Sequence, residues 1–177
     1  MAPSLHAKRT PAQGQLHDPT AATKHTLRTL ARRVQNLSEE IKELDDDLAT
    51  LTTNTAPTLS AMFGVGPEVA GQILTTVGDN PERLHSSSAF AHLCGVAPIQ
   101  ASSGKTNRHR LNRCGDRGAN SALYRIAIVG LRYDPRTQAY SDKLASNQKS
   151  NKEILRCLKR AIAREIYQAI KTDFNIS

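Results

Sequence analysis

The segment Leu59–Gly78, LSAMFGVGPEVAGQILTTVG, decides how the rest of the chain is interpreted. Its pattern predicts two short helices joined by a tight turn at Gly64-Val65-Gly66. Pro67 suits the first position of the second helix, where a missing N–H group costs nothing. The small side chain of Ala70 would let the two helices approach closely. This pattern is typical of a helix-hairpin-helix over residues 59–78, a motif that grips backbone phosphates of nucleic acid without reading bases.

The turn of this segment is a candidate phosphate site. Its two glycines leave backbone N–H groups bare at the N-terminus of a helix, which suits an anion. We therefore predict that Gly64, Val65 and Gly66 bind phosphate. The alternative is a packing turn that contacts no ligand.

Upstream of this segment, aliphatic residues recur at alternating spacings of three and four. This is the seam of a coiled coil over more than three heptads, and it predicts a helix over residues 24–55 that needs a partner from its own chain or a second copy. Its outer positions are basic at the start and acidic later, which suits an antiparallel pair, and a parallel pair stays open. Asp45, Asp46 and Asp47 are interpreted as a solvated face and not a metal site, because neighbouring helical positions diverge around the axis. The seam consists of Leu27, Leu30, Val34, Leu37, Ile41, Leu44, Leu48 and Leu51.

Composition restricts the class of protein and of partner. The net charge of +8 favours a polyanionic partner, because Lys and Arg gain affinity by releasing condensed counterions. The three cysteines form no C-x-x-C motif, which indicates reduced thiols and neither disulfides nor a zinc site. No segment has a membrane-spanning length and the N-terminus lacks a signal-peptide core, so we expect a cytoplasmic protein with no membrane partner. Residues 1–23 are expected to form a disordered tail.

The second informative stretch is Gln100–Asn120, QASSGKTNRHRLNRCGDRGAN. Ser102-Ser103-Gly104 stands at its entrance, in a loop that is expected to start a short hairpin. A serine beside several guanidinium groups suits phosphoryl transfer, because the hydroxyl is the nucleophile and Arg binds phosphate oxygens bidentately. The alternative is a basic loop that lies on a DNA backbone and does no chemistry, and spacing alone favours it. The cations are Lys105, Arg108, Arg110, Arg113 and Arg117.

The remainder predicts a compact helical domain over residues 56–173. Helices are expected over Ser88–Cys94, Ala119–Tyr133 and Thr137–Ala145, and a last one follows the capping box of Ser150 and Glu153. The fold class is therefore mainly α: a long N-terminal coiled-coil helix, then this domain with its serine/arginine loop at 100–117. The more solvated face of the last helix is expected to carry Lys152, Lys159, Arg160 and Arg164. Three tyrosines are interpreted as packing groups and not as base-stacking platforms: Tyr133, Tyr140 and Tyr167.

Taken together, these stretches resemble one family. The runs GVGPEVAGQIL, GDNPERL, FAHLCGVAPIQASSGKTNRHRLNRCGDRGAN, LRYDPRTQAY and KEILRCLKRAIAREIY are similar to the C-terminal domain of insertion sequence 110 (116/110/902) family transposases. The helix LARRVQNLSEEIKELDDDL is similar to the coiled coil that precedes this domain. The resemblance covers roughly Lys24–Lys171.

The resemblance implies a DNA recombinase that cuts and rejoins DNA through a serine–phosphate linkage, guided by a bridge RNA. The family's serine precedes a glycine, which implies Ser103 as the catalytic residue and Ser102 as the alternative. Arg108, Arg110 and Arg113 are then candidates for holding the scissile phosphate. Further DNA contacts are expected from Gly104, Lys105 and Arg117. The implied partners are DNA, the guide RNA, and a second copy or a partner transposase chain bound through the Leu27–Leu51 coiled coil.

The chain departs from the family in one respect. The resemblance implies an N-terminal RuvC-like domain with four acidic metal ligands, and no segment upstream of the coiled coil supplies it. We therefore expect no cofactor bound by this chain, with Mg²⁺ reaching the site only through such a domain. We also expect a truncated copy or one half of a split enzyme that is inactive alone. The alternative is a catalytically inactive DNA- or RNA-binding remnant that dimerises through its coiled coil.

Overall fold

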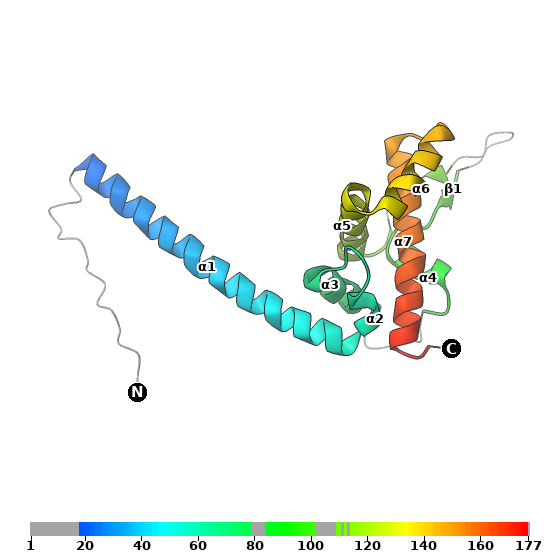
Figure 1. Ribbon diagram of the computed structural model, residues 1–177, viewed down its shortest axis with the longest axis horizontal. Coiled ribbons are helices and arrows are strands. Elements are labelled where there is room, and N and C mark those ends of the chain that lie inside the picture. The colour runs from blue at the N-terminus through cyan, green and yellow to red at the C-terminus, as the bar shows by residue number, and fades with distance from the viewer. Residues whose placement is uncertain (1–17, 79–83, 102–108, 111, 113, 177) are drawn as a thin grey trace. The chain divides into compact units, whose positions relative to one another are not determined.

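The computed structural model describes residues 18–78, 84–101, 109–110, 112 and 114–176 (Figure 1). Within these ranges the chain forms seven helices and a single two-stranded sheet, so the prediction of a mainly α fold is confirmed. The chain divides into two compact units at Leu44 and Asp45. No helix among the described residues is long and apolar enough to cross a membrane.

Helix α1 extends over Pro19–Thr55 and confirms the long N-terminal helix. It begins within the segment expected to be a disordered tail, because the carboxylate of Asp18 accepts hydrogen bonds from the N–H groups of Thr20 and Ala21, both at 3.1 Å. Residues 1–17 of that expected tail lie outside the described residues. The large seam side chains that are exposed are Leu27, Leu30, Val34, Leu37, Ile41, Leu44 and Leu51. Their pairing in a coiled coil stays a prediction.

The second unit packs its helices around α7, Asn151–Asp173. This helix contacts α2 (Pro57–Ser60), α4 (Ser87–Leu93), α5 (Arg117–Tyr133) and α6 (Pro135–Ser146), and Figure 1 shows it running alongside the last three. Helix α3, Pro67–Val77, packs mainly on α5. The largest fully buried side chains of this core are Phe90, Leu59, Ile73, Leu123, Ile166, Ile170 and Cys94.

Side-chain caps fix where these helices start. Ser86 caps α4 by accepting from the N–H of Ala89 at 3.1 Å, and Asp116 caps α5 by accepting from Ala119 at 2.6 Å. The predicted capping box of Ser150 and Glu153 is confirmed at the start of α7. Helix α6 begins two residues before the predicted start, because Asp134 caps it and the backbone of Pro135 already suits a first helical position.

The segment 59–78 folds as the second half of the single-turn helix α2, Pro57–Ser60, followed by a tight turn and α3. Gly64 has φ +78°, a conformation that glycine adopts readily, and a Cβ there would lie 3.5 Å from Ile126 and Val129 of α5. Pro67 is the first residue of α3, as predicted. The helix-hairpin-helix assignment stays a prediction, since the first helix has four residues.

Candidate nucleic-acid interface

A two-stranded hairpin forms one side of the candidate site. Strand β1, Ile99–Gln100, pairs antiparallel with β2, His109–Arg110, so that Gln100 lies opposite His109. A hairpin is therefore present, and its strands lie outside the Ser102–Gly104 stretch at which it was expected to start. The segment between its strands contains the predicted residues Ser102, Ser103, Gly104, Lys105 and Arg108, which lie outside the described residues, as does Arg113.

Two glycines, Gly95 before the hairpin and Gly115 after it, allow the two flanking chain segments to pack directly against each other. Gly95 and Gly115 have φ +65° and +111°, which disfavour any residue with a Cβ. A Cβ at Gly115 would lie 2.5 Å from the backbone nitrogen of Gly95, and one at Gly95 would lie 2.7 Å from the carbonyl oxygen of Cys114. The N–H of Asp116 also donates to the carbonyl of Leu93 at 2.7 Å. The hairpin thus leaves and rejoins the helical core at one tightly packed point.

Asn120 connects this point to α7. Its side-chain amide donates to the carbonyl oxygens of Cys94 and Gly95, at 2.9 and 3.2 Å. Its side-chain oxygen accepts from Nζ of Lys159, on α7, at 2.9 Å. A single half-buried side chain therefore fixes α5, the hairpin flank and one lysine of α7 relative to each other.

A groove of about 690 Å³ lies between the hairpin flank, α6 and α7, and we call it the basic groove. Six Lys and Arg residues and one His line it, against Glu153 as the carboxylate among its described lining residues. Tyr140 of α6, Cys157 of α7 and Asn112 also line it. The cationic lining consists of His109, Arg110, Lys149, Arg156, Lys159, Arg160 and Arg164.

The cations of α7 repel each other in the absence of an anion. Burial lowers the pKa of Lys159, and the positive charge of Arg156 lowers it further. Burial also lowers the pKa of Arg160, with a smaller contribution from Arg164. The guanidinium of Arg160 donates to the carbonyl of Ser87, a neutral acceptor, at 3.0 Å. An anion in the groove would relieve these costs, because an opposite charge favours the protonated form of both groups.

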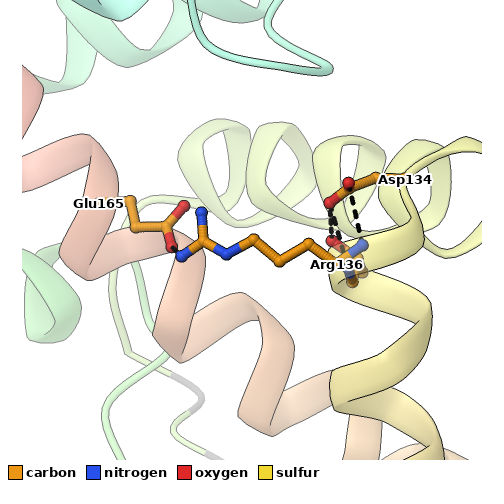
Figure 2. A network of polar contacts seen from close by, with 4 residues as sticks. Asp134, Arg136 and Glu165 are labelled. Carbon is orange, nitrogen blue, oxygen red and sulfur yellow. Dashed lines mark hydrogen bonds and ion pairs between the residues drawn. The ribbon is translucent and has the colours of Figure 1, made fainter.

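Helix α6, which contributes Tyr140, contacts α5 and α7, and an exposed ion pair adds to its contact with α7. Figure 2 shows Arg136 of α6 reaching the carboxylate of Glu165 on α7, with 2.7 Å between the charged atoms. At the start of α6, the carboxylate of Asp134 accepts from the hydroxyl of Thr137 at 2.6 Å, and this hydrogen bond is the main cause of the lowered pKa of Asp134. Gly130 lets α5 approach α6 there, since a Cβ would lie 3.0 Å from the Thr137 hydroxyl.

Of the predicted cations that the structure describes, Arg110 lines the basic groove. Arg117, the first residue of α5, is exposed and does not line it. The turn at Gly64, Val65 and Gly66 does not line it either. Next to that turn, Glu68 in the first turn of α3 pairs with Arg125 at 2.6 Å, which places a carboxylate beside the predicted phosphate site.

Most of the groove's cations were not predicted as site residues. Lys159, Arg160 and Arg164 were expected on the solvated face of α7, but no ligand was predicted for them. Arg156 was not included in that face. A usable signal was present: Lys152, Arg156, Arg160 and Arg164 follow one another at intervals of four and share one face of a helix. Sequence spacing did not show that this face lies beside the hairpin.

The tyrosine predictions have mixed outcomes. Tyr167 is buried and donates its hydroxyl to the carbonyl of Leu84 at 3.1 Å, so its packing role is confirmed. The same prediction is wrong for Tyr133, which is 62% exposed, and for Tyr140, which is 39% exposed. Tyr133 is the last residue of α5, and Tyr140 lies on the side of α6 that faces the groove.

No group of three or more His, Cys, Asp or Glu among the described residues is placed to hold a metal ion. Mg²⁺ prefers oxygen ligands such as carboxylates, and the described lining of the groove presents Glu153 as its one carboxylate, among cations. The described residues therefore do not fit a magnesium site.

Residues 56–142 match the sequence model of the transposase IS116/IS110/IS902 family. This region belongs to that family of transposases. The transposase region includes the hairpin and its flanks, whereas α7 with its cations follows it in sequence.

Two insertion-element proteins resemble the chain. It is 30% identical over 106 residues to an uncharacterized 43.6 kDa protein of insertion element IS110 from Streptomyces coelicolor, covering 59% of this chain and 26% of that protein. It is 26% identical over 134 residues to an uncharacterized 42 kDa protein of insertion element IS900 from Mycobacterium paratuberculosis, covering 74% of this chain and 34% of that protein. The alignments thus cover about a quarter to a third of the length of these relatives.

Proposed function

We propose that this chain binds the sugar–phosphate backbone of nucleic acid in the basic groove, as the serine-bearing part of a DNA recombinase. One observation carries the proposal: among the described lining residues, six Lys and Arg converge on the groove with one carboxylate, beside the hairpin whose strands flank Ser103 in sequence. Membership of a transposase family supports DNA as the polymer.

The electrostatics of α7 support phosphate as the ligand. Lys159 and Arg160 are partly desolvated and lie next to like charges, so they gain from a phosphate more than fully solvated cations do. Arg156, Arg160 and Arg164 succeed one another along one helical face with a rise of about 6 Å per step. This spacing lets one helix contact several phosphates of one strand, each contact releasing counterions.

The proposed reaction is an attack of Ser103, with Ser102 as the alternative, on a DNA phosphodiester. The serine oxygen loses its proton and bonds to phosphorus, while the bond to one sugar oxygen breaks and that oxygen leaves with a proton. Arg108, Arg110 and Arg113 are proposed to bind the non-bridging oxygens, where negative charge builds up. Gly104, Lys105 and Arg117 are proposed as neighbouring backbone contacts. Mg²⁺, if needed, is proposed to bind a RuvC-like domain and not the residues described here.

Three further contacts complete the proposal. The turn at residues 64–66 is proposed as a second phosphate contact, in which the ligand would lie beside the carboxylate of Glu68 in the first turn of α3. A guide RNA is proposed as a second nucleic-acid partner. The exposed apolar seam between Leu27 and Leu51 is proposed to pair with a second copy or with another transposase chain, because such a stripe is costly in water.

A covalent adduct tests the proposed chemistry. The chain is incubated with labelled DNA carrying an element junction and Mg²⁺, with and without a supplied RuvC-like domain and guide RNA. We expect an adduct that survives denaturation in the complemented reaction and is lost in Ser103→Ala. Loss of the adduct in Ser102→Ala instead would identify the alternative nucleophile. Salt-sensitive DNA binding without any adduct would instead support the second candidate function, a catalytically inactive nucleic-acid-binding remnant.

A further inference from the structure

We propose that the basic groove holds an unpaired nucleotide strand, and that Tyr140 is the platform on which one of its bases stacks. This inference rests on the proposed function, since it requires nucleic acid in the groove. Beyond the proposed function, the inference assigns a role to a residue of α6. It also specifies a single strand as the ligand, which the charge of the groove alone does not.

Tyr140 differs from the other tyrosines in its surroundings. It is 39% exposed and lines the same groove as Arg156 and Arg160. Tyr133 is more exposed, but it does not line the groove, and the guanidinium of Arg132 lies over its ring at 5.2 Å from the centroid. Tyr140 is therefore the aromatic ring of the groove wall among the described residues.

The position of Tyr140 is fixed by the contacts of α6. Leu144 of α6 packs against Ile154 and Leu158 of α7 and Ala127 of α5. One turn before Tyr140, the solvent-exposed ion pair of Arg136 with Glu165 adds a further contact to α7 (Figure 2). Asp134 caps the helix through the N–H groups of Arg136 and Thr137, at 3.2 and 3.1 Å. A ring held on an anchored helix loses little entropy when a base stacks on it, which favours binding.

An aromatic ring beside a row of cations suits a single strand. The bases of a duplex are stacked and paired inside it, so only their edges reach a protein in the grooves. An unpaired base offers its face, and stacking on aromatic side chains beside a positively charged groove is the usual way proteins bind single strands. The row of Arg156, Arg160 and Arg164 supplies the backbone contacts along one strand.

Binding measurements with matched ligands separate stacking from charge. The ligands are a single-stranded DNA oligonucleotide, its RNA counterpart, the DNA duplex, and an abasic strand that has the same number of phosphates. We expect Tyr140→Ala to weaken binding of the base-bearing strands roughly 5- to 150-fold. Tyr140→Phe keeps the ring and should bind like the unchanged chain. The abasic strand should bind the unchanged chain weakly and should not distinguish it from Tyr140→Ala.

A tryptophan reporter provides a second readout. The chain has no tryptophan, so Tyr140→Trp introduces a single indole, which can be excited selectively over the remaining tyrosines. We expect the base-bearing strands to quench its emission and the abasic strand not to, whereas Tyr133→Trp, outside the groove, should respond to neither. Comparing the affinities for the DNA strand and the RNA strand identifies the sugar of the natural ligand. Either preference supports the proposal, provided that the abasic strand binds weakly.

Two different failures are distinguishable. Equal affinity for base-bearing and abasic strands, or unchanged binding by Tyr140→Ala, overturns the stacking role and leaves the proposed function intact. Tighter binding of the duplex than of the single strands also overturns it. Failure to bind any of the four ligands overturns the proposed function itself. Circular dichroism of each variant confirms that it folds before its affinity is compared.

Discussion

At the scale of single residues, Asn120 connects most of the site. It donates to two carbonyls of the hairpin flank and accepts from Lys159, so three elements depend on one side chain. The hairpin flank and the α7 cations therefore keep a common geometry, which a backbone-binding groove requires.

Asn120→Ala should destabilise the fold. It leaves the carbonyls of Cys94 and Gly95 without this donor, and we expect a loss of about 1–3 kcal/mol in the free energy of unfolding, measured by urea denaturation. Asn151→Ala, at an exposed position of α7, is the control and should change stability by less than about 0.5 kcal/mol. Equal losses for the two variants would contradict the role of Asn120.

The cysteines should differ in reactivity. Burial, with a smaller effect of Asp116, raises the pKa of Cys94 to about 12, so its thiolate is scarce at neutral pH. We expect alkylation of the native chain to modify exposed Cys114 and to spare Cys94, as read by mass spectrometry of peptides. Because the folded pKa lies above the ordinary 9.0, the buried thiol contributes stability below pH 9 that is lost as the pH rises toward 12. Modification of Cys94 at the rate of Cys114 would contradict this burial.

At the scale of elements, α7 joins the core to the groove. One face carries buried Ile154, Leu158 and Ile166, and another carries the cations of the groove. Its start is fixed by the capping box, in which Glu153 accepts from the backbone N–H and the hydroxyl of Ser150, at 2.9 and 2.7 Å.

The capping box makes a pH-dependent contribution to folding. The hydroxyl of Ser150 is the main cause of the lowered pKa of Glu153, followed by the backbone N–H of Ser150. The stabilisation is therefore complete above pH 4.5, the ordinary value, and is lost as the pH falls through the folded pKa. Ser150→Ala should raise the pKa of Glu153 toward 4.5 in an NMR titration, with Ser146→Ala as the control. An unchanged pKa in Ser150→Ala would contradict this account.

Sequence patterns predicted where the helices lie in the chain better than which helices contact each other. The periodicity of apolar residues predicted α5 and α7, and the capping box of Ser150 and Glu153 located the start of α7, because these signals are local. Helix α5 begins at Arg117, two residues before the predicted Ala119, because the side chain of Asp116 caps it. The groove depends on contacts between distant segments: Asn120 with Lys159, and Gly95 with Gly115. Helical spacing identifies a cationic face without saying which element lies opposite it. For the same reason Tyr140 was assigned to packing, although its ring lines the groove.

At the scale of the whole molecule, the exposed seam of α1 predicts self-association. We expect the chain to be oligomeric in sedimentation analysis at micromolar concentrations, because leaving these side chains in water is unfavourable. Leu37→Glu with Ile41→Glu should shift it toward the monomer, and Lys42→Glu, outside the seam, should not. A monomer at all concentrations would contradict pairing of the seam with a second copy and leave another transposase chain as its partner.

The binding of nucleic acid by the basic groove is most directly tested by the salt dependence of affinity. Arg156→Gln with Arg164→Gln removes two exposed groove cations, while Arg160 is left in place because it also bonds the core. Arg132→Gln with Lys143→Gln removes the same charge from exposed positions outside the groove. The account predicts that the slope of log K against log salt concentration for a single strand falls by about 1.4 in the groove variant and stays unchanged in the control. Equal slopes for the two variants would show that the groove does not hold the backbone.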